Sequence, residues 1–157
     1  MEILCLKKNE TDSVLSCTRK DGSKTWRHII PFFISHDICH FAVEKILCLK
    51  NGFYGMVAAG IDINEFDLPK EERKFVISEE AIFTEHLVNL LTIEYAQGKM
   101  DNFMEVFSAL YEQHAGTDFY TVLTGEKLSE IRNFFNDLMQ QWHLLPVHKT
   151  MTLFFEE

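Results

Sequence analysis

The sequence predicts an α+β domain in which a small antiparallel sheet, built from both ends of the chain, packs against three to four helices. Two observations predict this class. Short strand-like segments stand at the two ends, and helix-like segments with capping residues stand between them. The chain has 157 residues, of which 46% are hydrophobic and 25% charged, the balance of one folded domain. No repeat or linker-like stretch divides residues 1–157, so we expect a single domain.

The predicted sheet begins with a three-stranded meander at the N-terminus. An Asp21-Gly22 pair, which favours a tight hairpin turn, separates the second and third strands. At the C-terminus, apolar and polar residues alternate as they do in a half-buried strand, and we expect this strand to cover an edge of the meander. The strands are expected at residues 2–7, 13–18, 24–30 and 149–157.

Four helices are expected between these strands, each one beginning after a side chain that can accept a hydrogen bond from a free backbone N–H. Segment 50–77 is rich in glycine and then acidic, and we expect it to be a loop with at most one short strand or helical turn. The expected helices are 36–49 after Ser35, 79–97 after Ser78, 102–115 after Asp101 and 125–142 after Thr124.

Charge and composition exclude several classes of partner. Lys and Arg total 15 against 24 Asp and Glu, a net charge of −9. Nucleic acids and anionic membranes both attract basic surfaces, so we expect neither as a partner. The N-terminal residues lack a secretory signal, and no segment has the roughly 18 apolar residues of a membrane span, which predicts a cytoplasmic protein. The four cysteines form no C-x-x-C pair and are expected to be free thiols.

One polar cluster stands out in the first predicted helix. His36, His40 and Glu44 follow one another at intervals of four, so on a helix they fall within about 80° of arc, with Asp37 beside them. Two imidazoles one turn apart are a common way to hold a divalent transition metal. We expect a pocket here that binds a metal ion or a small ligand, with hydrolysis as one reaction it could support, and Asp37 orienting an imidazole.

A metal site on this helix needs a third protein ligand. The candidates are Glu44 on the same helix and His86 on the next one, where it lies among apolar residues. His114 lies on a similar apolar stripe further along the chain. The predicted metal-site residues are therefore His36, His40, Glu44 and His86. Asp37 would orient an imidazole without binding the metal itself.

Two other interpretations remain open. The polar cluster can be a structural hydrogen-bond network, because buried polar side chains are commonly paired with each other. The protein can also be a non-enzymatic interaction module. Its surface would be formed by the acidic segment 62–72 and by aromatic residues, and it would meet a protein partner or a second copy in a homodimer. These aromatic residues are Phe32, Phe33, Phe53 and Tyr54. The sequence assigns no reaction, so whether the protein is an enzyme stays open.

The segment HDICHFAVE, followed by NGFYG, resembles a family of small uncharacterised bacterial proteins. The shared pattern is His-Asp-x-x-His-Phe-x-Val-Glu and then Gly-Phe-Tyr-Gly, after an N-terminal meander with an Asp-Gly turn. The likeness is specific over residues 20–60 and diffuse elsewhere, and His86 and His114 lie outside the motif. The resemblance implies a shared architecture and a bacterial origin, but it implies no activity and no cofactor.

Overall fold

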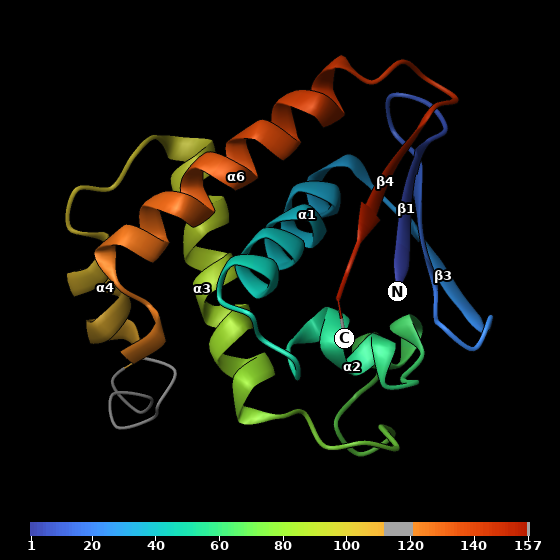
Figure 1. Ribbon diagram of the computed structural model, residues 1–157, viewed down its shortest axis with the longest axis horizontal. Coiled ribbons are helices and arrows are strands. Elements are labelled where there is room, and N and C mark those ends of the chain that lie inside the picture. Colours follow the sequence, from blue (N-terminus) through green and yellow to red (C-terminus); the bar gives the residue numbers. More distant parts are fainter. Residues whose placement is uncertain (112–120, 157) are drawn as a thin grey trace.

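The four strands form one antiparallel sheet, and the α+β class is confirmed. The structure is a computed structural model and describes residues 1–111 and 121–156. The strand order is β3-β2-β1-β4, so the C-terminal strand pairs with the N-terminal strand and covers one side of the meander, as expected (Figure 1). The strands are β1 (Glu2–Lys7), β2 (Ser13–Thr18), β3 (Lys24–Ile29) and β4 (Thr150–Phe154).

The turn between β2 and β3 is formed by the residues that predicted it. Gly22 has a φ of 84°, in the left-handed region that glycine adopts without a steric penalty. The Asp21 carboxylate accepts hydrogen bonds from the backbone N–H and the hydroxyl of Ser23, at 2.9 and 2.7 Å. The turn therefore sets the register that places Trp26 opposite Ser16.

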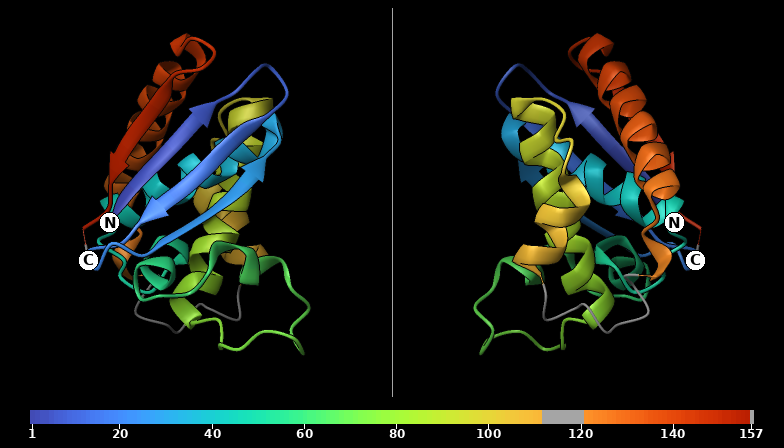
Figure 2. Two further views of the ribbon diagram at one scale, coloured as in Figure 1. Left: turned by 90° about the vertical axis from the view of Figure 1, so that its right-hand side faces the viewer. Right: turned by 90° about the vertical axis from the view of Figure 1, so that its left-hand side faces the viewer.

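Five α-helices and a short 3-10 helix are found among the described residues. The first helix, α1, lies against one face of the sheet, and α3 and α6 pack on its other sides (Figure 1). Figure 2 shows that the helices α1, α3, α4 and α6 lie on this one side of the sheet. The helices are α1 (Pro31–Ile46), α2 (Phe53–Ala58), α3 (Glu79–Gln97), α4 (Phe103–Leu110) and α6 (Gly125–Leu144), and the 3-10 helix η1 spans Ile63–Asp67.

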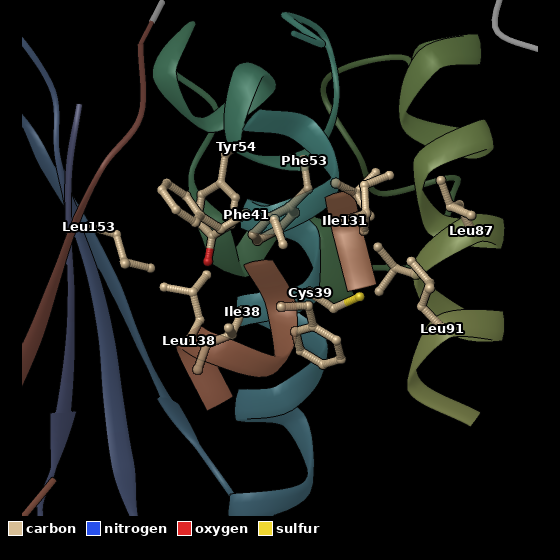
Figure 3. Close-up of a cluster of buried hydrophobic side chains, with 14 of the residues drawn as sticks. Ile38, Cys39, Phe41, Phe53, Tyr54, Leu87, Leu91, Ile131, Leu138 and Leu153 are labelled. Atoms are coloured by element: carbon tan, nitrogen blue, oxygen red, sulfur yellow. The ribbon is translucent and has the colours of Figure 1, made fainter. Parts of the chain in front are cut away.

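Helix α1 is the centre of the core. Figure 3 shows its apolar side chains between Leu153 of the sheet on one side and Leu87 and Leu91 of α3 on the other. Because neighbours surround α1, three of its polar residues are buried as well: the exposed fractions of Asp37, His40 and Glu44 are 1%, 2% and 1%. Burying a polar group without a partner is costly, so each of these side chains needs one.

The boundaries of α1 and of the third predicted helix differ from the expectation. Helix α1 begins at Pro31, five residues early, because proline is well tolerated where the N–H has no intrahelical partner; Ser35 therefore lies inside the helix. Helix α4 follows Asn102 instead of Asp101. The expected continuation of that helix to residue 115 lies outside the described residues. The capping residues predicted for the other two helices are confirmed, since Ser78 accepts from Ala81 N and Thr124 from Lys127 N.

Segment 50–77, expected to be a loop with at most one short strand or helical turn, contains both α2 and η1, and α2 raises the number of described α-helices to five, above the expected three to four. Helix α2 is six residues long and contains a glycine, which has a low intrinsic helix propensity. Short helices of this kind depend on contacts from elsewhere in the fold. No helix in the described part of the chain combines the length and hydropathy that crossing a bilayer requires.

Candidate metal centre

Two histidines of α1 and one glutamate of α3 converge on a common point. The Nε2 atom of His36 lies 3.3 Å from Oε1 of Glu85, and Nε2 of His40 lies 3.0 Å from Oε2 of the same carboxylate. The two imidazole rings are 4.8 Å apart between centroids. One potential ligand atom from each of the three residues lies within 4.8 Å of the others. Within residues 1–111 and 121–156, no other group of three His, Cys, Asp or Glu side chains has such a geometry.

Glu85 is the residue that sequence reasoning missed. It meets α1 because α3 packs against α1 with the N-terminus of α3 beside the C-terminus of α1, where Ser78 donates a hydrogen bond to Asn51 O. The signal in the sequence is a pair of polar residues, Glu85 and Asn89, spaced one helical turn apart. In the structure Asn89 Nδ2 donates a hydrogen bond to Glu85 Oε1 at 3.1 Å. This polar strip borders the apolar face of α3 and so faces the rim of a helix interface.

The structure does not bring the imidazole of His86 into this group. Adjacent helical residues point about 100° apart, so when Glu85 points at α1 its neighbour points elsewhere. The His86 ring stacks on Tyr111, with centroids 3.9 Å apart and an interplanar angle of 13°. His86 still lines the same pocket as the cluster. The other candidate third ligand, His114, lies outside the described residues.

The structure places Glu44 behind His40 instead of beside the two Nε2 atoms. Its Oε1 lies 3.5 Å from Nδ1 of His40, on the opposite side of the ring from Glu85. The two carboxylate oxygens accept hydrogen bonds from the backbone N–H groups of Tyr54 and Gly55, each at 3.2 Å. These N–H groups belong to the first turn of α2, where they have no partner inside the helix. Glu44 therefore caps α2 and faces the imidazole at the same time.

Two glycines of the NGFYG segment leave room for this arrangement. A Cβ atom on Gly52 would lie 2.5 Å from Cδ of Glu44, closer than real atoms approach. A Cβ atom on Gly55 would overlap the backbone carbonyl of Lys50. Both positions require the absence of a side chain because of close approach, and neither has a positive φ.

Asp37 stands behind the other histidine. Its Oδ1 lies 3.9 Å from Nδ1 of His36, on the side of the ring away from Glu85, which is where an orienting carboxylate would stand. The Nη2 atom of Arg27 donates to both carboxylate oxygens of Asp37, at 2.9 and 3.1 Å. The Tyr54 hydroxyl donates to the backbone carbonyl of Asp37 at 3.1 Å. Each imidazole thus has Glu85 on its Nε2 side and a second carboxylate on its Nδ1 side.

In this cluster the carboxylates stabilise the protonated imidazoles, and the imidazoles stabilise the ionised Glu85. Burial opposes protonation of His36, but the nearby carboxylates of Asp37 and Glu85 outweigh burial and raise the pKa of His36 to about 9. The pKa of His40 is also raised, because Glu44 and Glu85 outweigh burial and the neighbouring His36. Burial opposes ionisation of Glu85, but the two imidazoles lower its pKa well below the usual range. The metal-free cluster is therefore an ion-paired network at neutral pH.

The cluster lines a pocket of about 720 Å³ that is partly open to solvent. The pocket lies between α1 and α3, and its surface is mostly apolar. Such pockets, with a few convergent polar groups and perturbed pKa values, are typical of small-molecule sites. The Glu85 side chain lines this pocket and is 48% accessible.

The aromatic interaction surface expected from the sequence is wrong in part. Phe53 and Tyr54 are buried in the core, since Glu44 holds the first turn of α2 against α1. Phe33 is exposed and lines the pocket, and Phe53, although buried, also contributes to the pocket wall. The side chain of Phe32 lies outside the described part of the structure.

The chain was compared with known proteins in three ways. No family model, no curated protein and no solved structure matches it.

Proposed function

We propose that this protein binds one divalent transition metal ion through Nε2 of His36, Nε2 of His40 and the carboxylate of Glu85. The observation that carries the proposal is the convergence of these three groups within 4.8 Å of one another at the wall of a pocket. Two imidazoles and a carboxylate form a donor set of the kind that holds zinc and iron(II) in proteins.

The surroundings of the two histidines support a metal over a purely structural network. A metal-binding imidazole commonly hydrogen-bonds a carboxylate through its other nitrogen, which fixes the ring and its tautomer. Glu44 lies on this side of His40, 3.5 Å from Nδ1, and Asp37 on this side of His36, 3.9 Å from Nδ1, although in the metal-free structure His40 Nδ1 has no hydrogen bond to a described residue. A network serving only stability would not need both Nε2 atoms directed at one carboxylate with two further carboxylates behind the rings.

The chemistry that such a site supplies is Lewis-acid activation of water or of a bound oxygen atom. Three protein ligands leave at least one position of a divalent ion open to the pocket. A bound metal lowers the pKa of water, which makes hydrolysis the reaction class that the site favours. Asp37 is held by Arg27 and is not placed to act as a general base. We propose hydrolysis of a small molecule as the activity.

The proposal gives a role to the residues that carry the resemblance to a family of bacterial proteins. The motif residues His36, His40 and Glu44 would form the ligand helix, and Gly52 and Gly55 the space for Glu44. We propose that proteins sharing the motif share the metal site.

The proposal is tested by metal binding to untagged protein. Elemental analysis after incubation with zinc and gel filtration should give one zinc per chain, and His40→Ala should bind none. His28→Ala is the matched control, because the His28 side chain is 57% exposed at the surface and away from the cluster. Since His40 is buried and its loss can affect folding, Glu85→Gln is the second variant: its side chain is 48% exposed, and circular dichroism should show a native fold. A folded Glu85→Gln protein that retains one zinc would contradict the proposed ligand set.

A further inference from the structure

The pocket beside the proposed metal site is an elongated groove. Along α3 it is lined from Ala81 to Ile93, which corresponds to about 18 Å at the helical rise per residue. The N-terminal half of α1, including the exposed Phe33, forms the opposite wall. Glu85 and the two histidines lie partway along this length. The shape suits an extended molecule that passes the metal.

The floor on one side of the cluster is aromatic. The Phe53 ring lies 5.2 Å from the His40 ring between centroids, and the Phe66 ring lies 4.9 Å from that of Phe53. Both phenylalanines line the groove. A ligand reaching from the metal in this direction therefore crosses an apolar stretch about two rings long.

Two arginines border this aromatic floor: the Cζ atom of Arg27 lies 5.7 Å from the centroid of the Phe53 ring, and Arg73 lies beside Phe66. The chain has a net charge of −9 and only four arginines, yet two of them, Arg27 and Arg73, line the groove. The charge of Arg27 is balanced by Asp37 and by Asp67, whose Oδ1 lies 3.5 Å from Nη1. Arg73 has no carboxylate within ion-pair distance among the described residues.

Arg73 is held in place by neutral groups. Its Nε donates to the carbonyl of Leu68 at 2.7 Å and its Nη2 to the carbonyl of Phe66 at 2.9 Å. These two hydrogen bonds orient the guanidinium, but their acceptors are neutral and do not balance its positive charge. Neither bond uses the third nitrogen, Nη1. A planar, oriented guanidinium suits a carboxylate.

We propose that the groove binds an amphipathic organic monocarboxylate, with the carboxylate at Arg73 and the apolar chain running over Phe66 and Phe53 and past the metal site. The assignment deepens the proposed function and rests on it for the reaction: the bond hydrolysed lies in the body of the molecule, separated from the carboxylate by the apolar stretch. The apolar chain would cover two partly exposed isoleucines of α3, Ile82 on one side of Glu85 and Ile93 on the other. Covering exposed apolar side chains favours binding.

The test uses dodecanoate and dodecan-1-ol as probes, each titrated calorimetrically into the zinc-loaded full-length protein, the acid below its micelle concentration and the alcohol below its solubility limit. Dodecanoate should bind about tenfold or more tightly than the alcohol, the difference expected for a charge-assisted hydrogen bond. Arg73→Met should remove this preference. Lys74→Met should keep it, because Lys74 is the adjacent, exposed residue with the same charge and does not line the groove. Ile93→Asp should weaken both probes by placing a charge on the apolar wall.

The outcomes separate this inference from the metal site. Zinc binding is measured first and should be equal in wild type, Arg73→Met and Lys74→Met. If zinc binds and neither probe binds, or if the alcohol binds as tightly as the acid, the carboxylate assignment is wrong and the metal site stands. Tighter binding of dodecyl phosphate than of dodecanoate would also overturn it. If zinc does not bind but dodecanoate binds through Arg73, the proposed function fails and the ligand class stands.

Discussion

His40 and Glu44 lie one turn apart on α1, with Nδ1 and Oε1 separated by 3.5 Å, and the same carboxylate accepts the first free N–H groups of α2. One side chain therefore supports a proposed metal ligand and starts a neighbouring helix. Because Gly52 gives Glu44 its space, the position of α2 and the orientation of His40 depend on each other.

Replacing Gly52 by Ala should disturb both features. The added Cβ would lie 2.5 Å from Glu44 Cδ, so the carboxylate must shift away from α2 and His40. We expect a loss of unfolding free energy of about 1–3 kcal/mol, as for a buried polar group left without its hydrogen bonds. The affinity for zinc should also fall by about 10–100-fold, as it does when outer carboxylates of metal sites are lost.

The control for this variant is Gly125→Ala. Gly125 begins α6, has no atom near the place of a Cβ, and does not have a positive φ. It should leave zinc binding unchanged and keep or slightly raise stability. Urea denaturation and zinc titration of both variants make the comparison. Equal behaviour of the two variants would mean that Glu44 is not held as described.

Arg27→Met should destabilise the protein by about 3 kcal/mol, because it leaves the buried carboxylate of Asp37 without its cation. The double variant Arg27→Met/Asp37→Asn should recover most of this loss, since both charges are then gone. Chemical denaturation of the two variants and of Asp37→Asn alone gives the coupling free energy. A double variant as unstable as Arg27→Met alone would show that the ion pair is not the source of the effect.

Metal binding should become stronger as the pH rises from 6 to 9. A metal needs neutral imidazole, and the Glu85 and Asp37 carboxylates raise the pKa of His36 to about 9 in the metal-free protein. Below pH 9 the ion must therefore displace a proton from His36, and also one from His40, whose pKa is raised too. Titration with Co²⁺, followed by its visible spectrum and by proton release, measures this directly. A pH-independent affinity between pH 6 and 9 would contradict the proposed network.

The unfolding free energy of the metal-free protein should fall as the pH rises from 6 to 9, whereas metal affinity rises. Because the folded-state pKa of His36 lies above its ordinary value of 6.5, its charged form stabilises the fold fully below pH 6.5, and this contribution is lost as the pH rises through 9. The pKa of Glu85 is lowered, so its contribution is present above its ordinary value of 4.5 and is lost in acid. His36→Gln should flatten the decline between pH 6.5 and 9 in urea denaturation measured with a chelator present.

The sheet and the long helices were predictable because local residues determine them. Asp21 and Gly22 form the turn between β2 and β3, and Ser78 and Thr124 cap α3 and α6 as their positions in the sequence indicate. The start of α1 was missed because both Pro31 and Ser35 are acceptable near a helix N-terminus. Only the packing of α1 across the sheet selects between them.

Two of the three proposed ligands followed from the spacing of His36 and His40 on one helix. The third member could not be found in this way, because Glu85 is 45 residues from His40 and reaches it only through the packing of α3 on α1. The extent of helix α2 was missed for a similar reason, since its cap is Glu44, a residue of another helix. In each case the missing information is a contact between elements, which the local sequence pattern does not contain.

The most direct test of the central proposal is the zinc stoichiometry of wild type and Glu85→Gln, measured by elemental analysis on untagged, folded protein. Glu79→Gln is the matched control, because Glu79 is an exposed glutamate at the start of the same helix and lies outside the cluster. We predict one zinc per chain in wild type and Glu79→Gln, and no zinc retained by Glu85→Gln after gel filtration, because loss of a ligand should weaken zinc binding by at least about 100-fold. No zinc in the wild type, or equal zinc in all three proteins, would contradict a metal centre formed by His36, His40 and Glu85.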